Sequence, residues 1–522
     1  MVDNIAEKMS KGLREISVAE FFEKNRHLLG FDNPAKALLT VVKEAVDNSL
    51  DACEEADILP EIKVKIVQKG EDRFKVIIHD NGPGIVKDKI PRVFGKLLYG
   101  SKFHKMQQGR GQQGIGISAA VLYSQLTTGK PTIIRSRISG KKDPHEFHLR
   151  IDTVKNEPHI IKDFKYDKNF PDHGIYVEME IEGSFKRGKR SVDEYMKQTA
   201  LANPAAKISY QNPYKERFSY PRIVNKLPKK AKSIKPHPYG VELGVFERMA
   251  KSTHARSIAG FMTTDFSRVG LETAKQVCKL AKINPSTPSH ALGHDELEKI
   301  WRNLQKAKLM KPPLDCLSPI GASVLEKAVL KDTKCEFVTS ITRPPSVYRG
   351  NPFGIEVCIG YGGELPNEKS AIIARIANRV PLIHEASACA ITKALKEVDW
   401  RHYKMDHSNG IPTGPFIIMV HMYSTWIPYT SEGKEAIDAY PVIQKEIKLA
   451  IQDCARKMAR FLAGKRKRHL EKKRQSLFEK YIPELAISLE NLSGIKKQKI
   501  ITDLQKIIKK PVVEGEEVAN DV

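Results

Sequence analysis

A helix that ends near Asp51 constrains this chain more than any other stretch, because it places polar groups along one side of an apolar surface. Asn33 followed by Pro34 is a typical N-cap and first helical residue, so we expect the helix to begin there. Glu44, Asn48 and Asp51 recur at i, i+4 and i+7, which puts them on one face. Apolar residues cover most of the remaining surface: Leu38, Leu39, Val42, Ala45, Val46 and Leu50. The polar stripe predicts either a functional site or a helix face open to water.

The composition indicates a folded protein with a polyanionic partner. Apolar residues make up 41% of the 522 residues and charged residues 29%, which is typical of globular domains. Lys and Arg number 87 against 62 Asp and Glu, and this net charge of +25 favours a partner such as nucleic acid. A basic enzyme without such a partner has the same composition. The length allows about two to four domains.

The cysteine pattern and the hydropathy predict a cytoplasmic protein that does not interact with a membrane. The seven cysteines are scattered without a CxxC pair, which indicates reduced thiols rather than a disulfide framework or a zinc ribbon. No apolar run reaches the length of a membrane span, and the first residues lack the apolar core of a signal peptide.

Two alternating apolar runs, 62–67 and 74–78, predict a β-hairpin whose second strand ends at a candidate ligand site. Asp80 stands where that strand stops, and Gly82 and Gly84 follow it, so the backbone there can approach a ligand closely. A tight turn with a capping aspartate has the same composition. The motif alone leaves both interpretations open.

A glycine-rich segment, GRGQQGIGISAAVLYSQ, predicts a loop that leads into an apolar helix. Gly109, Gly111 and Gly114 match GxGxxG, but a polar loop rather than a strand precedes them, which argues against a dinucleotide-binding fold. No GK[ST] follows, which argues against a P-loop. The backbone N–H groups and the dipole at the start of the following helix are then a candidate phosphate site.

The three motifs together, in this order, resemble the nucleotide site of the GHKL ATPases, the superfamily of DNA gyrase, histidine kinases and MutL. The motifs are Glu44-x-x-x-Asn48-x-x-Asp51, Asp80-x-Gly82-x-Gly84 and the lid from Gly111 to Gly116. Over nearly the whole chain, local sequences such as DNSLDA, DNGPGI and PHPYGV resemble the B subunits of type IIB DNA topoisomerases (topoisomerase VI). The resemblance implies an α+β multidomain protein: a GHKL (Bergerat) ATPase α/β sandwich, a helix-two-turn-helix module, and a transducer α/β domain with a right-handed crossover and a long C-terminal helix.

The resemblance also implies ATP and Mg²⁺ as ligands. Glu44 would activate the attacking water as a general base, Asn48 would bind Mg²⁺, and Asp80 would accept a hydrogen bond from the adenine amino group. Lys434 matches the lysine that reaches the γ-phosphate from another domain and would act with Glu44 in catalysis. The further nucleotide-binding residues that the match implies are Asp51, Gly82, Gly84, Ser101, Lys102, Gly111, Gln112, Gln113, Gly114, Ile115, Gly116, Ile117 and Ser118.

The end of the first domain departs from the superfamily at one position. Three further alternating runs, PTIIRSRI, EFHLRIDTV and IYVEMEIEG, predict strands that complete one mixed sheet near residue 220. Many GHKL proteins carry Gly-Thr near the adenine, whereas this chain has Gly174-Ile175. Ile175 has no hydroxyl group, so the contact of that threonine with the base has no counterpart at this position.

The middle of the chain predicts a linker and a helical module. Residues 226–238 are rich in Lys and Pro, which is typical of a linker. Helical patterns run over 264–281, with a break at Gly270, and over 295–309, and these resemble the helix-two-turn-helix module. Arg268, beside the break, is a candidate contact to DNA phosphates, although a solvated charged face has the same pattern.

From Cys335 the pattern changes to strands, a helix, another strand, and a long basic helix from about Ala436 to Gln475. The order strand, helix, strand predicts a crossover unit and resembles the transducer domain. The sequence of Trp400, Arg401, His402 and Tyr403 resembles a Trp-Lys-x-Tyr element that family members place at the DNA-facing base of this domain. Trp400, Arg401 and Tyr403 are therefore candidate DNA contacts, and Arg401 keeps the charge of the lysine.

The resemblance implies a domain organisation and an assembly. The expected parts are an N-terminal arm (1–28), a GHKL ATPase domain (29–225), a linker with the helix-two-turn-helix domain (226–315), a transducer domain with the long basic helix (316–475), and an A-subunit docking segment with a disordered tail (476–522). Two B subunits would dimerise on ATP binding and capture double-stranded DNA. The topoisomerase VI A subunit would cleave a second duplex, through which the captured one passes, within an A2B2 heterotetramer at the nucleoid. This passage relaxes supercoils and decatenates DNA.

Two other classes of protein remain as alternatives. Another GHKL ATPase, such as a chaperone or a MutL-like protein, would use the same ATP site, and a chaperone's hydrolysis would not respond to DNA. A non-catalytic nucleic-acid-binding scaffold would keep the positive charge but tolerate loss of Glu44.

Overall fold

A computed structural model describes residues 9–10, 13, 15–102, 105–111, 114–140, 142–166, 168–367, 369–431 and 433–508, and the chain divides into two compact units, residues 1–455 and 456–522. Within the first unit, buried apolar side chains form three main groups, which lie mainly in residues 19–210, 241–304 and 325–419. The third group also includes Leu201 and Ala202, so it extends into the expected ATPase domain. The domain boundaries expected near residues 225 and 315 stay predictions.

The helix predicted to start at Asn33 is α3 (Pro34–Glu55). The Asn33 side chain accepts hydrogen bonds from the N–H groups of Ala35 and Lys36, which caps the helix as predicted. The apolar residues of α3 enter the first core, and those that are buried include Leu38, Leu39, Val42, Val46 and Leu50. Burial of this wide face fixes the direction in which the polar stripe points.

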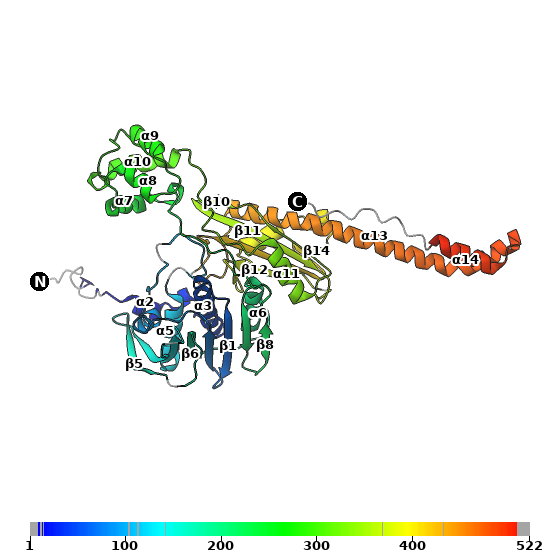
Figure 1. Cartoon of the computed structure of the whole chain (residues 1–522), viewed down its shortest axis with the longest axis horizontal. Helices are drawn as coiled ribbons and strands as arrows, with labels where there is room; N and C mark the ends of the chain where they lie inside the picture. The colour runs from blue at the N-terminus through cyan, green and yellow to red at the C-terminus, as the bar shows by residue number, and fades with distance from the viewer. Residues whose placement is uncertain are drawn as a thin grey trace. The chain divides into compact units, whose positions relative to one another are not determined.

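Eight described strands form the sheet against which α3 packs (Figure 1). They are β1 (Glu61–Gln68), β2 (Arg73–Asp80), β3 (Thr132–Arg137), β4 (His145–Asp152), β5 (Glu157–Lys165), β6 (Gly174–Glu182), β7 (Lys207–Gln211) and β8 (Arg217–Tyr220). The order is β5-β4-β3-β6-β2-β1-β7-β8, and the β1–β7 pair is parallel while the other neighbours are antiparallel. The mixed sheet predicted from the sequence is therefore confirmed.

Helices cover one face of this sheet. The helices of this part are α2 (Val18–Lys24), α3, α4 (Ile90–Gly95), α5 (Gly116–Thr128) and α6 (Val192–Ala202). β1 alternates between buried and more exposed residues, so its two faces have different surroundings. Because α3 and α5 lie over the sheet, the start of α5 comes to the end of β2, where the predicted motifs meet.

Two local predictions for this part were wrong or incomplete. The sequence PRVFGKLLYGSKF predicts a helix that breaks at Gly100. The helix α4 instead ends at Gly95, where Lys96 is already extended and a Cβ on Gly95 would lie 2.6 Å from the Pro158 side chain. Strand β5 was not predicted, because it is an edge strand and most of its residues are exposed on both faces.

The helical module has a core of its own. Its helices are α7 (Leu243–Ser252), α8 (Ile258–Asp265), α9 (Leu271–Ala281) and α10 (His294–Lys306). The predicted helix over 264–281 is in fact the last residues of α8 followed by α9, so the predicted break at Gly270 is confirmed but the first helix begins earlier. Phe246, Phe261 and Phe266 pack edge to face or tilted at the centre of this core.

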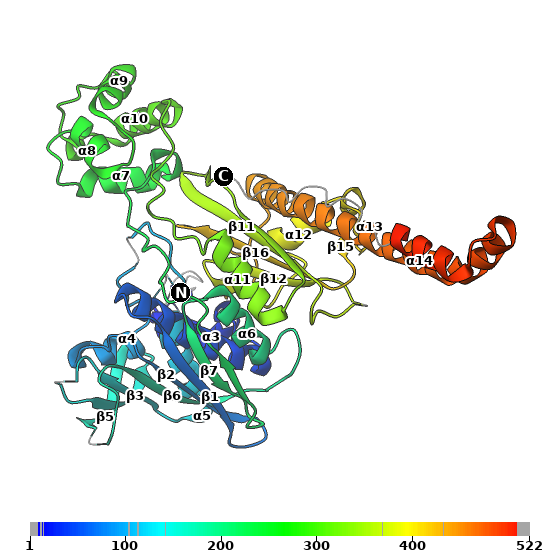
Figure 2. The same cartoon turned by 45° about the vertical axis from the view of Figure 1, so that its right-hand side comes forward.

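A second sheet follows in residues 337–424. Its strands are β9 (Phe337–Thr342), β10 (Ser346–Tyr348), β11 (Asn351–Tyr361), β12 (Ile372–Ala377), β13 (Val380–Pro381) and β16 (Phe416–Ser424), and a small separate ladder joins β14 (His407–Ser408) to β15 (Ile411–Pro412). β12 and β16 are parallel, and α12 (Ala390–Lys396) lies in the connection between them, as the predicted crossover requires. β16 is buried throughout, and α11 (Ala322–Thr333) packs on β9 and β11. Figure 2 shows α11 beside β11.

The long basic helix is α13 (Pro441–Ser493), which starts later and ends later than predicted. Within the first unit, its residues Ile443, Ile447 and Ile451 are buried, and the Cys454 thiol contacts the carbonyl of Val357 in β11. The second unit contains the rest of α13 and α14 (Lys497–Ile508). The segment expected to dock the A subunit is therefore helical over most of its described residues, and the expected tail lies outside them.

Two composition-based expectations concern the whole chain. The seven cysteines are buried thiols that form no disulfide bond in the part of the chain that is described. Among the described residues, no helix combines the length and the apolar character needed to cross a membrane.

Candidate active site

A cavity with a volume of about 580 Å³ lies between α3, the end of β2, the start of α5 and the loop that contains Lys434. The predicted site residues that line it are Glu44, Asn48, Asp80, Gly84, Ser101, Lys102, Gly111, Gly114, Ile115, Gly116, Ile117 and Lys434. Apolar residues complete the wall, among them Ile78, Val93, Phe94 and Val177. A cavity of this size, lined by both polar and apolar side chains, suits a ligand that combines a flat ring with charged groups.

The polar stripe of α3 divides between this cavity and an ion cluster next to it. Glu44 and Asn48 line the cavity, whereas Asp51 is not among its lining residues. The Asp51 carboxylate accepts hydrogen bonds from Lys102 at 2.6 Å and Arg110 at 2.7 Å. Although burial acts in the opposite direction, these two cations hold the pKa of Asp51 well below its usual range. Asp51 therefore orients Lys102 rather than facing the ligand space itself.

The Glu44 carboxylate lies against the start of α5. A Cβ on Gly116 would lie 1.9 Å from Glu44 Oε2, so only glycine leaves room for this carboxylate. Lys434 Nζ is 4.0 Å from Glu44 Oε1. On the next turn of α3, burial and then the charge of Glu44 raise the pKa of Asp47 to about 6. The carboxylate is thus held between a cation and a helix N-terminus, at the edge of the cavity.

Asp80 is a fixed acceptor at the end of β2. Its Oδ1 accepts hydrogen bonds from the N–H groups of Gly82 at 2.9 Å and Ile175 at 3.2 Å, and its Oδ2 accepts one from the Ser49 hydroxyl at 2.7 Å. Burial raises the pKa of Asp80, and these three donors act against that shift. Gly84, with a φ of +73°, approaches the carbonyl of Arg137 so closely that a Cβ would lie 2.1 Å from the oxygen.

Cations of α3 hold the loop that carries Lys434. Lys43 is buried and donates a hydrogen bond to the carbonyl of Gly433 at 2.8 Å, and Lys36 pairs with Glu435 at 2.6 Å. Lys434 has a φ of +53°, and its Nζ donates to the carbonyl of Arg110 at 3.1 Å. The loop thus brings this lysine to the cavity although it lies about 390 residues from Lys43 in sequence.

The other predicted ligands lie beside the cavity or outside the described residues. The Gly82 N–H donates to Asp80 Oδ1. Ser118 is 1% exposed, and its hydroxyl donates to the carbonyl of Ile115. Both support the wall without lining it. Gln112 and Gln113 lie outside the described residues.

The sequence matches two family models. Residues 33–154 match the family described as histidine kinase-, DNA gyrase B-, and HSP90-like ATPase, and residues 312–474 match the topoisomerase VI B subunit transducer. These two ranges contain all the predicted nucleotide-site residues, because the first holds α3, Asp80 and the lid and the second holds Lys434.

Curated relatives match over most of the chain. The B subunit of type 2 DNA topoisomerase 6 from Methanosarcina barkeri is 44% identical over 508 residues, which cover 97% of this chain and 81% of that protein. The chain belongs to the family of type 2 DNA topoisomerase 6 B subunits. Other relatives of this family are those of Methanococcoides burtonii, 46% identical over 94% of this chain and 79% of that protein, and of Pyrococcus horikoshii, 38% identical over 98% of each. This B subunit has the ATPase and transducer domains of its family.

The candidate DNA contacts of this B subunit differ in their exposure. Trp400 and Tyr403, in the short 3-10 helix η5 (Trp400–Tyr403), are 0% and 6% exposed, and the Trp400 indole donates to the carbonyls of Leu395 and Gly410. Their predicted direct contact with DNA does not fit this burial. Arg401 between them is exposed, as is Arg268 in the turn between α8 and α9.

Sequence reasoning missed two residues of the site. Ser49 bonds Asp80, and Arg110 binds Asp51 from the glycine-rich segment. Arg110 could have been found, because it is the one charged residue in GRGQQGIG and because Asp51 and Glu54, on one face of a helix, are candidate partners for it. Ser49 has no comparable signal, because its role depends on α3 packing against the end of β2.

Proposed function

We propose that this B subunit binds ATP with Mg²⁺ in the cavity between α3 and α5 and hydrolyses it to drive closure of the ATPase and transducer domains. Asp80 would accept a hydrogen bond from the adenine amino group, and Glu44 would orient the attacking water and take its proton. The start of α5 and the lid would bind the phosphates through backbone N–H groups.

The observation that carries this proposal is the meeting of Glu44 and Lys434 at one cavity. The two residues come from the two matched domains, and their charged groups are 4.0 Å apart. A terminal phosphate beside Lys434 would be the counter-charge of that lysine, and the neighbouring Glu44 carboxylate would orient the water that attacks it. Hydrolysis would in this way change a contact between domains.

The residues at the cavity fit a magnesium ion. Asn48 is exposed to the cavity one helical turn from Glu44, and an amide oxygen is a ligand that Mg²⁺ accepts. Among the described residues there is no cluster of three or more His, Cys, Asp or Glu side chains that could hold a metal, which suits an ion bound mainly by phosphate and water. Bound Mg²⁺ would supply neutralisation of phosphate charge.

We further infer that closure dimerises two B subunits around a DNA duplex and that a topoisomerase VI A subunit cleaves a second duplex within an A2B2 heterotetramer. The net charge of +25 supports a polyanionic partner, and the names of the relatives, which are B subunits, support a role as one part of a larger enzyme. Mixing this chain with the A subunit, ATP and supercoiled plasmid should give relaxed plasmid. Equal relaxation without ATP or without this chain would contradict the proposal.

Replacing Lys434 should slow the chemical step more than it weakens ATP binding. Lys434→Ala should lower kcat about 30-fold while the ATP dissociation constant stays within about threefold, because the lysine contacts the phosphate fully only in the closed state. Steady-state hydrolysis and equilibrium titration with ATP check both values. Lys445→Ala, at an exposed lysine of α13, is the control. An equal loss in binding and turnover would remove the closing role of Lys434.

Replacing Arg401 should weaken DNA binding through phosphate contacts. Each phosphate contact contributes roughly −0.9 to the slope of log affinity against log salt, so Arg401→Glu should make that slope shallower by about one contact while ATP binding stays unchanged. Titration of a labelled duplex at several salt concentrations gives the slope. Arg73→Glu, at an exposed arginine at the start of β2, is the matched charge control. An unchanged slope in Arg401→Glu would move the DNA contact elsewhere, such as to Arg268.

A further inference from the structure

The base of the lid, residues 108–110, is held by the transducer. The Gln108 side chain exchanges two hydrogen bonds with the Ser318 backbone, at 2.6 and 3.0 Å. The amide of Asn378 donates to the carbonyl of Gly109 at 3.1 Å. Lys434 donates to the Arg110 carbonyl. Gln108, Gly109 and Arg110 therefore each contact a residue in the range that matches the transducer.

The Arg110 side chain fixes the same segment to the ATPase domain. Arg110 is 2% exposed, and its guanidinium donates to Asp51 at 2.7 Å, to both oxygens of Glu54 at 2.6 and 3.1 Å, and to Asn203 at 2.5 Å. These partners lie in α3 and at the end of α6. A buried guanidinium with this many charged acceptors is a strong, geometrically specific anchor.

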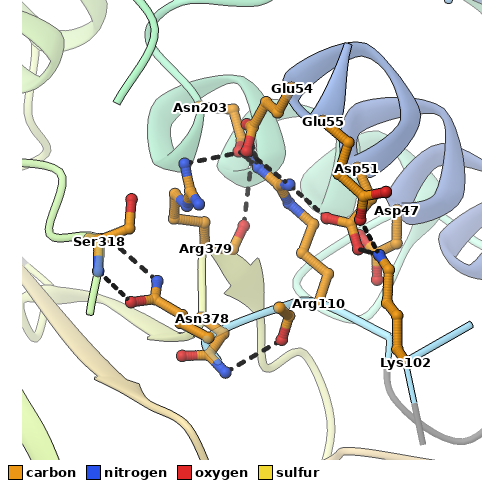
Figure 3. Close-up of polar contacts among 12 residues, drawn as sticks. Asp47, Asp51, Glu54, Glu55, Lys102, Arg110, Asn203, Ser318, Asn378 and Arg379 are labelled. Carbon is orange, nitrogen blue, oxygen red and sulfur yellow. Dashed lines mark hydrogen bonds and ion pairs between the residues drawn. The ribbon is translucent and has the colours of Figure 1, made fainter. Parts of the chain in front are cut away.

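A second arginine reaches the same cluster from the transducer. Asn378 and Arg379 form a tight turn between β12 and β13, and both have left-handed backbones, with φ of +48° and +66°. Arg379 Nη1 lies 3.1 Å from the Glu54 carboxylate, and the backbone carbonyl of Arg379 accepts a hydrogen bond from Asn203 at 3.2 Å. Figure 3 shows Glu54 and Asn203 together with Arg110 and Arg379 in this cluster.

The transducer sheet sets the position of this turn. The Arg379 N–H donates to His421 Nε2 at 3.1 Å, and His421 Nδ1 lies 2.8 Å from Glu356. His421 and Glu356 are both fully buried in β16 and β11. Because His421 Nε2 accepts, its Nδ1 carries the proton and donates to Glu356. The turn is therefore a rigid projection of the sheet.

The two arginines are held unequally. Burial lowers the pKa of Arg379, and among the described residues its Nε and Nη1 have no hydrogen-bond partner even though Nη1 is close to Glu54. Arg110 has four bonds to charged or amide acceptors and, within the same described ranges, leaves only its Nε unpaired. Arg379 has more unpaired N–H groups than Arg110 and is therefore the weaker of the two anchors. The cluster separates most easily at the Arg379–Glu54 contact.

We propose that Arg379 and Glu54 form a releasable latch through which the transducer positions the lid base. When the 378–379 turn is docked, Glu54 holds both arginines, the Gly109 and Arg110 carbonyls are fixed, and Lys434 is kept beside Glu44. When the turn withdraws, the Arg110 side chain stays with the ATPase domain, but the Gly109 carbonyl loses its donor from Asn378, and the Arg110 carbonyl that Lys434 contacts is less firmly placed. Arg379 is thus a positioning residue. The latch itself does not depend on the proposed ATPase function, but its expected effect on hydrolysis rests on that function.

Hydrogen–deuterium exchange of the full chain without nucleotide tests the latch directly. Arg379→Gln should speed amide exchange in residues 108–111 about tenfold, and Arg379→Lys should restore much of the protection because it keeps the charge. The matched control is Arg343→Gln, which breaks an arginine pair with Glu446 and Asp453 elsewhere in the transducer. Unchanged exchange in residues 108–111, or an equal rise throughout β11 and β16, would overturn the proposal.

Hydrolysis then separates the latch from the proposed function. Arg379→Gln should lower kcat about tenfold and change the ATP dissociation constant by less than about threefold, while Arg343→Gln hydrolyses ATP like the wild type. Loss of binding and turnover in equal measure would overturn the positioning role. If wild type fails to hydrolyse ATP, the proposed function fails, and the exchange result still decides the latch. Should Arg379→Gln not fold, Glu54→Gln takes its place with the same expected exchange at 108–111.

Discussion

Glu44→Ala should reduce ATP hydrolysis about 1000-fold while the chain still binds ATP. Glu44 is at the cavity edge beside the start of α5, but Asp80 and the lid offer the binding contacts, so base and ligand roles are separate. A positioned general base contributes about 100- to 10,000-fold to a rate. Steady-state hydrolysis and titration with ATP measure the two effects.

The isosteric change Glu44→Gln distinguishes proton transfer from packing. Glutamine fills the same space against Gly116 but cannot take a proton from water, so we expect it to be as inactive as alanine. If either variant turned over ATP at a rate near that of the wild type, Glu44 would not be the base. Another group at the cavity would then have to take the proton from the attacking water.

Asp80→Asn should raise the ATP dissociation constant about 100-fold. The amide oxygen can still accept from the N–H groups of Gly82 and Ile175, so the turn is preserved. The amide NH₂ would replace Oδ2, which now accepts a hydrogen bond from the Ser49 hydroxyl. It would then point a hydrogen-bond donor at the adenine amino group, which is itself a donor. Loss of a hydrogen bond to a charged group, with two donors opposed, supports a change of this size.

Nucleotide specificity checks the same residue a second way. A donor at this position suits the carbonyl oxygen of guanine, so the preference for ATP over GTP should shrink in Asp80→Asn. Titrations with fluorescent ATP and GTP analogues give both affinities. Ser49→Ala, which removes only one donor to Asp80, should have a much smaller effect. An ATP affinity of Asp80→Asn within about threefold of the wild type would exclude Asp80 as the base-binding residue.

Regular elements were predictable because their residues alternate between buried and exposed environments. The wide apolar face and Asn33 cap of α3, the β1–β2 hairpin and the β12–β16 crossover were all expected from periodicity and capping. Strand β5 and the end of α4 were not. β5 lies at a sheet edge with little burial, and α4 ends where Gly95 meets Pro158 from a distant strand.

The local motifs of the site were predictable, but the contacts between distant parts were not. Glu44, Asn48 and Asp80 stand out by spacing, whereas the role of Arg110 depends on α6 and that of Arg379 on a turn between short strands. The burial of Trp400 was also missed, because it depends on how the segment from Leu395 to Gly410 folds around the indole. Lys434 was found through the resemblance, because nothing in its neighbourhood distinguishes it from other lysines.

ATP hydrolysis by the purified chain, measured with and without duplex DNA and the A subunit, tests the central claim most directly. We expect hydrolysis that depends on Glu44 and that increases when DNA and the A subunit are both present, because duplex capture and ATP-driven closure of the two domains are coupled. Hydrolysis that does not respond to DNA or the A subunit would indicate a chaperone-like GHKL ATPase, and no hydrolysis under any of these conditions would contradict an ATP-driven role for this chain.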